Sequence, residues 1–150
     1  MPAGGVIWVP GNSGVVSLVD TLTGNELGRH HLVPPDLAPT PGNFGSPSRT
    51  AVDQNKCCWV GNRTAGTFVK VGQNRLNQYI DRNSNGIMDT SEDDNADTNV
   101  MLGEIAAWGS DECVLWEVSL VPGYESVNVP GEYEGVYDPA SRHADADGFR

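Results

Sequence analysis

A pattern that occurs twice, about fifty residues apart, limits the folds open to this 150-residue chain. In each copy a Trp-Val pair lies in one extended stretch, a turn rich in Gly or Asn follows, and a second stretch alternates in polarity. Residues 7–20 align in this way with residues 58–72, so that Trp8 matches Trp59. Each copy predicts a β-hairpin. Repetition at this period, with four strands in each unit, predicts blades packed side by side in a radial array.

The repeat therefore predicts an all-β fold, a β-propeller-like array of four-stranded antiparallel blades of which about two are present. The 18 glycines and 10 prolines agree with short strands and tight turns. The expected strands are residues 6–10, 14–20 and 26–33 in blade one, and 48–53, 57–62, 66–71 and 113–120 in blade two. We read residues 1–150 as a partial propeller, with blade one at 6–33 and blade two at 48–72 plus 113–120. An insert occupies 73–112, and a third blade begins within 134–150, where Val136–Asp138 echo Ala51–Asp53.

The insert contains a twelve-residue stretch, DRNSNGIMDTSE, at residues 81–92. Asp, Asn and Glu side chains supply oxygens at positions 1, 3, 5, 9 and 12, Gly86 stands at position 6, and position 7 offers a backbone carbonyl. This is the spacing of an EF-hand-like calcium loop, because Ca²⁺ takes six to eight hard oxygen ligands at flexible distances. The predicted ligands are Asp81, Asn83, Asn85, Ile87, Asp89 and Glu92. A polar turn rich in Asn and Gly is the alternative.

Charge supports a cation in this region. The chain has a net charge of −11, and residues 81–112 carry nine of its twenty acidic residues against one basic residue, Arg82. Such a cluster repels itself unless cations neutralise it. The same charge argues against binding to nucleic acid, which needs aligned Lys and Arg. A solvated acidic insert that only keeps the protein soluble is the alternative.

Several of these motifs together resemble a known group of proteins. RTAVD at 49–53, CWVGN at 58–62 and GTFVKV at 66–71 resemble bacterial extracytoplasmic propellers of the virginiamycin B lyase-like and NHL-like kind. The calcium loop and the later WGSDECVLW, residues 108–116, resemble an insert in such propellers. The resemblance implies a funnel of blades with loops on two faces, and an extracellular or periplasmic location. Those proteins often carry a Cys just before the loop, where this chain has Tyr79-Ile80, so the resemblance supplies no partner for Cys113.

The cysteines leave two states open. Cys57, Cys58 and Cys113 are odd in number, so at most one internal disulfide can form. Cys113 could pair with Cys57 or Cys58, or all three could be buried thiols. Vicinal residues on a strand point to opposite faces of the sheet, so we expect only one of Cys57 and Cys58 to face the core.

No residue pattern predicts a catalytic site. His30 and His31 are expected on a surface strand, without a nucleophile nearby. Arg49 could hold a carboxylate or sugar, or pair with Asp53. His143 is expected in a solvated turn, and the alternative is that it binds a metal together with Asp145 and Asp147. Within the insert, Met101, Ile105 and Trp108 are expected to fold back over the blade.

We therefore expect a calcium-stabilised module, secreted and non-catalytic, with a binding or structural role. The alternative is a lyase or hydrolase of the virginiamycin B lyase-like kind, with its site in the propeller channel. No apolar run is long enough to span a membrane, and residues 1–30 lack a signal-peptide pattern. The expected partners are further blades or copies of the chain, and a glycan or peptide. Self-assembly is expected because blades bury their faces against neighbours, and an uncovered blade would expose residues such as Val16, Leu18, Val69 and Val71.

Overall fold

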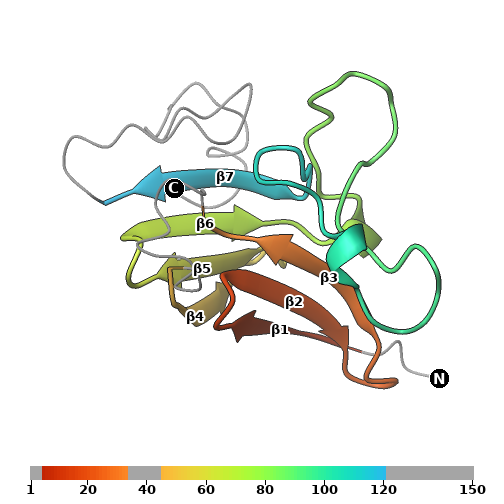
Figure 1. The fold of residues 1–150 in the computed structure, drawn as a ribbon, viewed down its shortest axis with the longest axis horizontal. Coiled ribbons are helices and arrows are strands. Elements are labelled where there is room, and N and C mark those ends of the chain that lie inside the picture. The colour runs from red at the N-terminus through yellow and green to blue at the C-terminus, as the bar shows by residue number, and fades with distance from the viewer. Residues whose placement is uncertain (1–4, 34–44, 121–150) are drawn as a thin grey trace.

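The computed structural model describes residues 5–33 and 45–120, which form two antiparallel β-sheets (Figure 1). The first sheet has the order β1-β2-β3 and the second the order β4-β5-β6-β7. The strands are β1 (Val6–Gly11), β2 (Val15–Asp20), β3 (Glu26–His31), β4 (Pro47–Val52), β5 (Cys58–Asn62), β6 (Thr67–Val71) and β7 (Val114–Ser119). The expected all-β class is confirmed, and each strand lies within two residues of its predicted range. The predicted start of a third blade, 134–150, lies outside the described residues.

The two aligned hairpins adopt the same local structure. In the first, Trp8 of β1 lies opposite Leu18 of β2. In the second, Trp59 of β5 lies opposite Lys70 of β6. Both turns contain a glycine with positive φ, Gly14 at 79° and Gly66 at 68°, a conformation that other residues adopt only with strain.

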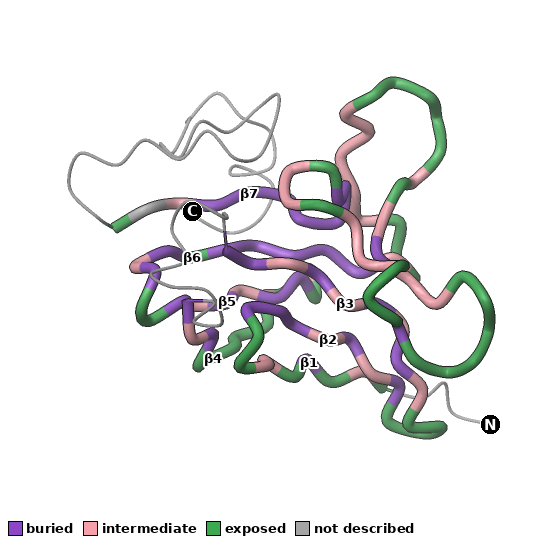
Figure 2. The backbone as a smooth tube through the Cα atoms, viewed as in Figure 1, coloured by how far each residue is buried: buried purple, intermediate pink, exposed green. Residues whose placement is uncertain are grey.

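The main core lies between the two sheets. It joins Trp8, Val16, Leu18, Leu32 and Val33 of the first sheet to Cys58, Val60, Ala65, Val69, Val71 and Val114 of the second. Figure 2 shows buried residues along most of β2, β6 and β7. The expectation that Val16, Leu18, Val69 and Val71 lie on an uncovered face is wrong, because all four are 0% exposed. Each sheet supplies the apolar layer that the other needs.

The second sheet is buried on its opposite side as well. Cys57, Leu115 and Trp116 form a smaller cluster there, with Trp59 packed against it. Cys58 belongs to the main core and Cys57 to this second cluster, so the vicinal cysteines do face opposite sides. Both are buried, and only Cys58 faces the main core between the sheets, as expected. Trp8 faces the second sheet, whereas Trp59, its counterpart in the repeat, faces away from the first. Equivalent faces of the two sheets therefore point in the same direction, as they do in successive blades, and do not face each other.

The strands β1 and β4 form the most exposed part of the sheets. Residues 48–52 of β4 are all exposed. Ile7 and Val9 of β1 are 51% and 44% exposed, and Val52 of β4 is 58% exposed. β1 is the end strand of its sheet, and within the described residues no strand pairs with its outer side. No helix in the described part of the chain is long and apolar enough to cross a membrane.

Candidate calcium-binding insert

The segment between β6 and β7 has little regular structure. It contains only two short 3-10 turns among its described residues, η2 (Asn74–Leu76) and η3 (Leu102–Glu104). It projects beyond one end of the sheets (Figure 1), and its loops are largely exposed (Figure 2). A segment of this length cannot form its own apolar core, so its order must come from polar contacts or a bound ion.

Residues 81–92 form a loop in which the predicted ligands lie close together. The Asp81 carboxylate accepts hydrogen bonds from the backbone N–H groups of Asn85, at 3.1 Å, and Gly86, at 2.9 Å. The Asp89 carboxylate accepts bonds from the side-chain amides of Asn83, at 2.7 Å, and Asn85, at 2.8 Å. Gly86 has φ of 75°, which permits the sharp turn at position 6. Four of the six predicted ligands are thus joined around one point.

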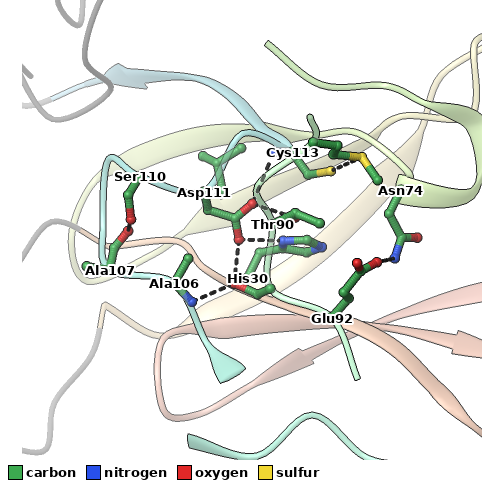
Figure 3. A network of polar contacts seen from close by, with 12 residues as sticks. His30, Asn74, Thr90, Glu92, Ala106, Ala107, Ser110, Asp111 and Cys113 are labelled. Atoms are coloured by element: carbon green, nitrogen blue, oxygen red, sulfur yellow. Dashed lines mark hydrogen bonds and ion pairs between the residues drawn. The ribbon is translucent and has the colours of Figure 1, made fainter. Parts of the chain in front are cut away.

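The other two predicted ligands differ. The Glu92 carboxylate lies 3.3 Å from the side-chain nitrogen of Asn74, and no bond joins it to the other predicted ligands among the described contacts (Figure 3). The Ile87 backbone N–H bonds to the side-chain oxygen of Asn85 at 2.7 Å, and the Ile87 side chain is 64% exposed. Within residues 5–33 and 45–120, no group of three or more His, Cys, Asp and Glu side chains is gathered closely enough to hold a metal. The loop is therefore ordered around its Asn and Asp side chains, without converged carboxylates.

A second loop with the same conformation follows directly. The Asp93 carboxylate accepts bonds from the backbone N–H groups of Asp97, at 3.1 Å, and Thr98, at 2.8 Å. These are positions 1, 5 and 6 of residues 93–104, and Asn95 and Glu104 stand at positions 3 and 12. Positions 4 and 6 have positive φ in both loops: Ser84 at 59° and Gly86 at 75° in the first, Ala96 at 59° and Thr98 at 81° in the second. Sequence reasoning missed this loop because Thr replaces Gly at position 6; the spacing of Asp, Asn, Asp and Glu was the available signal.

Asp111 fixes the insert to the first sheet (Figure 3). Its carboxylate lies 2.8 Å from Nδ1 of His30 in β3 and accepts bonds from the hydroxyls of Ser91, at 2.6 Å, and Thr90, at 2.7 Å. Burial alone would raise the pKa of Asp111, but His30 and the two hydroxyls outweigh it and hold the pKa below its usual value. The expectation that His30 lies on a surface strand is wrong, because it is 0% exposed and anchors this contact.

Glu112, just before β7, is hydrogen-bonded to the backbone of the first loop. Its buried carboxylate accepts bonds from the backbone N–H of Arg82, at 2.8 Å, and of Asp89, at 3.0 Å. The Arg82 guanidinium in turn donates to the carbonyls of Asp111, at 2.9 Å, and Val114. The one basic residue of the acidic region therefore bonds to the backbone at the start of β7. Sequence reasoning missed Asp111 and Glu112; an acidic pair directly before an apolar strand was the signal.

The insert also covers the free edge of β3. The backbone N–H of Arg29 bonds to the Ser91 carbonyl at 3.2 Å, and that of Glu26 bonds to the Thr98 carbonyl at 3.0 Å. The Glu26 carboxylate accepts the Val100 N–H at 2.9 Å. A segment that belongs to the second sheet thus satisfies the outer strand of the first, which protects this edge from pairing with another chain.

The three cysteines are buried, and none of them forms a disulfide. Cys113 lies 3.7 Å from the sulfur of Met88 in the first loop. Burial raises the pKa of both Cys58 and Cys113 to about 12, so both are protonated at neutral pH. The alternative of buried thiols agrees with the structure, and the disulfide does not.

The remaining candidates do not form a site. Arg49 is exposed, and the Asp53 carboxylate binds Trp59 and Lys70 instead. Trp108 packs against the main core as expected. Met101 is 51% exposed, so the expectation that it covers the sheet is wrong. His143 lies outside the described residues.

Comparison with known proteins adds no relative. No protein-family model matches the chain, and neither a curated protein nor a solved structure is significantly similar to it.

Proposed function

We propose that this chain is a calcium-stabilised segment of an extracytoplasmic β-propeller that acts as a non-catalytic binding or assembly module. The observation that carries the proposal is the ordered loop at residues 81–92. Its position-1 carboxylate already bonds the backbone at positions 5 and 6. Such pre-ordering lowers the entropy that an ion would otherwise have to offset on binding. The stacking of the two sheets in one sense supports the propeller, because neighbouring propeller blades also pack face to face in one sense.

Calcium in this proposal has a structural task. The loop is bonded through Glu112 to the start of β7 and through Asp111 to His30 of β3. An ion held by Asp81, Asn83, Asn85, Asp89 and the Ile87 carbonyl would offset carboxylate repulsion and stiffen the insert that covers β3. Glu92 would complete the set after turning from Asn74. The proposal extends to residues 93–104, because this loop repeats the conformation and the Asp, Asn, Asp and Glu spacing of the first.

The enzyme alternative has less support. A lyase of the resembling kind would need an accessible His and a Glu around a divalent ion. His30 is 0% exposed and bonded to Asp111, so a substrate cannot reach it without opening the insert. Glycan, peptide and further copies of the chain remain the proposed partners, and an extracellular or periplasmic location remains part of the proposal.

Calorimetric titration of the full chain with CaCl₂ tests the proposal. We expect a dissociation constant on the order of 10⁻⁴ to 10⁻³ M, the range of extracellular calcium modules. Asp81→Asn should abolish binding at the first loop, and Asp93→Asn should abolish any binding at the second. Asp94→Asn is the matched control, since this exposed carboxylate stands at a position that supplies no ligand. A folded chain that takes up no calcium at 10 mM, about ten times the weakest expected constant, would overturn the calcium proposal.

A further inference from the structure

The two aligned tryptophans differ in one hydrogen bond. Nε1 of Trp59 donates to the Asp53 carboxylate at 3.1 Å, and Asp53 directly follows β4, the strand paired with β5. Nε1 of Trp8 is buried and has no hydrogen-bond partner in the described structure. Leaving a buried N–H without an acceptor destabilises a fold, so such a group needs explanation.

The missing acceptor corresponds to a missing strand. In the second sheet, β4 pairs with β5, placing Ala51 opposite Trp59 and Val52 opposite Cys58. In the first sheet, no described strand occupies the equivalent place beside β1. The backbone of β1 thus presents a free edge, and Ile7 and Val9 are largely exposed there. An edge of this kind pairs readily with another strand.

The chain contains a segment with the features of β4. Residues 134–138, Glu-Gly-Val-Tyr-Asp, repeat the pattern of residues 49–53, so that Asp138 corresponds to Asp53. Placed against β1 in the register of β4 on β5, Val136 would lie opposite Trp8 and Gly135 opposite Val9. Asp138 would then stand where a carboxylate can accept the Trp8 N–H.

The charges beside Trp8 are opposite in sign to those of residues 134–138. A hollow of about 490 Å³ lies beside Trp8, and its charged lining residues are Lys56 and Arg75, with no carboxylate among the lining residues. Residues 134–138 carry two carboxylates, Glu134 and Asp138. Arg75 is already paired with Asp20 at 2.9 Å, so Lys56 supplies most of the positive charge that the segment would meet.

The order of the repeat indicates which copy supplies the segment. Residues 32–46 link β3 to β4, which begins the sheet after the first. Glu134 corresponds to Arg49. Residues 120–133 lead from β7 to Glu134, a link of 14 residues against the 17 residues, 32–48, between β3 and Arg49, so the segment would begin the sheet after the second. The chain's own β1 lies on the other side of the second sheet, across the main core. We therefore propose that residues 134–138 of one copy pair antiparallel with β1 of a second copy, where Asp138 accepts the hydrogen bond of Trp8. This inference rests on the propeller stacking in the proposed function.

Cysteine cross-linking between two variants tests the pairing. One sample of full-length chain carries Val9→Cys and a second carries Gly135→Cys, both in saturating CaCl₂. Mixed under mild oxidation, they should form a disulfide-linked dimer whose linked peptides contain positions 9 and 135. Replacing Gly135→Cys by His143→Cys is the matched control and should lower the yield several-fold. Asp138→Ala should weaken association about tenfold, as expected for one hydrogen bond to a charged group, whereas Asp145→Ala should not.

Three outcomes would overturn the inference. The first is absence of the 9–135 link in the mixture. The second is a link that forms only inside single chains of a Val9→Cys, Gly135→Cys double variant, because the chain would then bind its own segment. The third is a link that Asp138→Ala leaves unchanged. Calcium titration of the same samples separates the two proposals, since calcium binding without the link contradicts only the strand pairing, and the link without calcium binding contradicts only the calcium proposal.

Discussion

The two sheets are held together by apolar contacts, whereas the insert between β6 and β7 is held mainly by polar contacts. The sheets share an apolar core, in which Leu18, Val60 and Val69 are 0% exposed. The insert buries few apolar side chains and is instead bonded to the sheets through the Asp111 and Glu112 carboxylates. Apolar burial does not depend on protonation or on ions, whereas a buried carboxylate that loses a partner is left uncompensated. The insert should therefore be the more sensitive region to single polar changes, acid and ions.

The largest expected effect is at the carboxylate that joins the insert to the first sheet. Asp111→Ala should lower the free energy of unfolding by about 3–5 kcal/mol, because it leaves the buried His30 and Ser91 and the half-buried Thr90 without their acceptor. The insert should also become sensitive to limited proteolysis. The exposed Asp94→Ala is the control and should change stability by less than about 0.5 kcal/mol. Equal protease sensitivity of the two variants would remove the distinction between the regions.

The core should respond by cavity formation. Leu18→Ala should cost about 2–5 kcal/mol in urea unfolding, without selective cleavage of the insert, because both sheets lose contacts together. Ile7→Ala, on the exposed edge of β1, is the matched aliphatic control and should cost far less. A Leu18→Ala protein that loses only the insert would show that the main core is not shared as described.

Acid should act mainly on the insert. The pKa of Asp111 is lowered in the folded state relative to about 3.9 in the unfolded chain. Its ionisation therefore contributes stability that is full above about pH 5 and is lost as the pH falls through 3.9 toward the folded pKa. Unfolding measured from pH 6 to pH 2 should show a steeper loss below pH 4 for the wild type than for Asp111→Asn. Parallel curves would contradict the role given to this carboxylate.

Calcium should have the smallest effect. At ten times the dissociation constant, an ion bound only to the folded state adds about 1.4 kcal/mol. The melting temperature should rise in millimolar CaCl₂, and Asp81→Asn should cancel most of the rise, while Asp94→Asn should keep it. A rise that is equal in both variants would indicate general charge screening rather than binding at the loop.

Much of this architecture follows from the sequence alone. The Trp8 and Trp59 repeat, together with glycines at the turns, determined seven strands and two hairpins, because alternation and turn residues are local signals. The spacing at residues 81–92 likewise determined a turning loop with clustered oxygens. The spacing of Asp, Asn, Asp and Glu could also have predicted the second loop at 93–104, but Thr instead of Gly at position 6 departs from the calcium-loop pattern.

Only the tertiary structure decided which side chains meet across the chain. His30 and Asp111 are 81 residues apart and form a buried contact, yet neither has a local pattern that names the other. The same holds for Asp53, which bonds to Trp59 and Lys70 rather than to Arg49. The sequence determined local conformation because that depends on neighbouring residues. The stacking of the two sheets decided which side chains are buried and which of them contact one another. These contacts in turn determine which carboxylates hold the insert and which indole N–H is left without an acceptor.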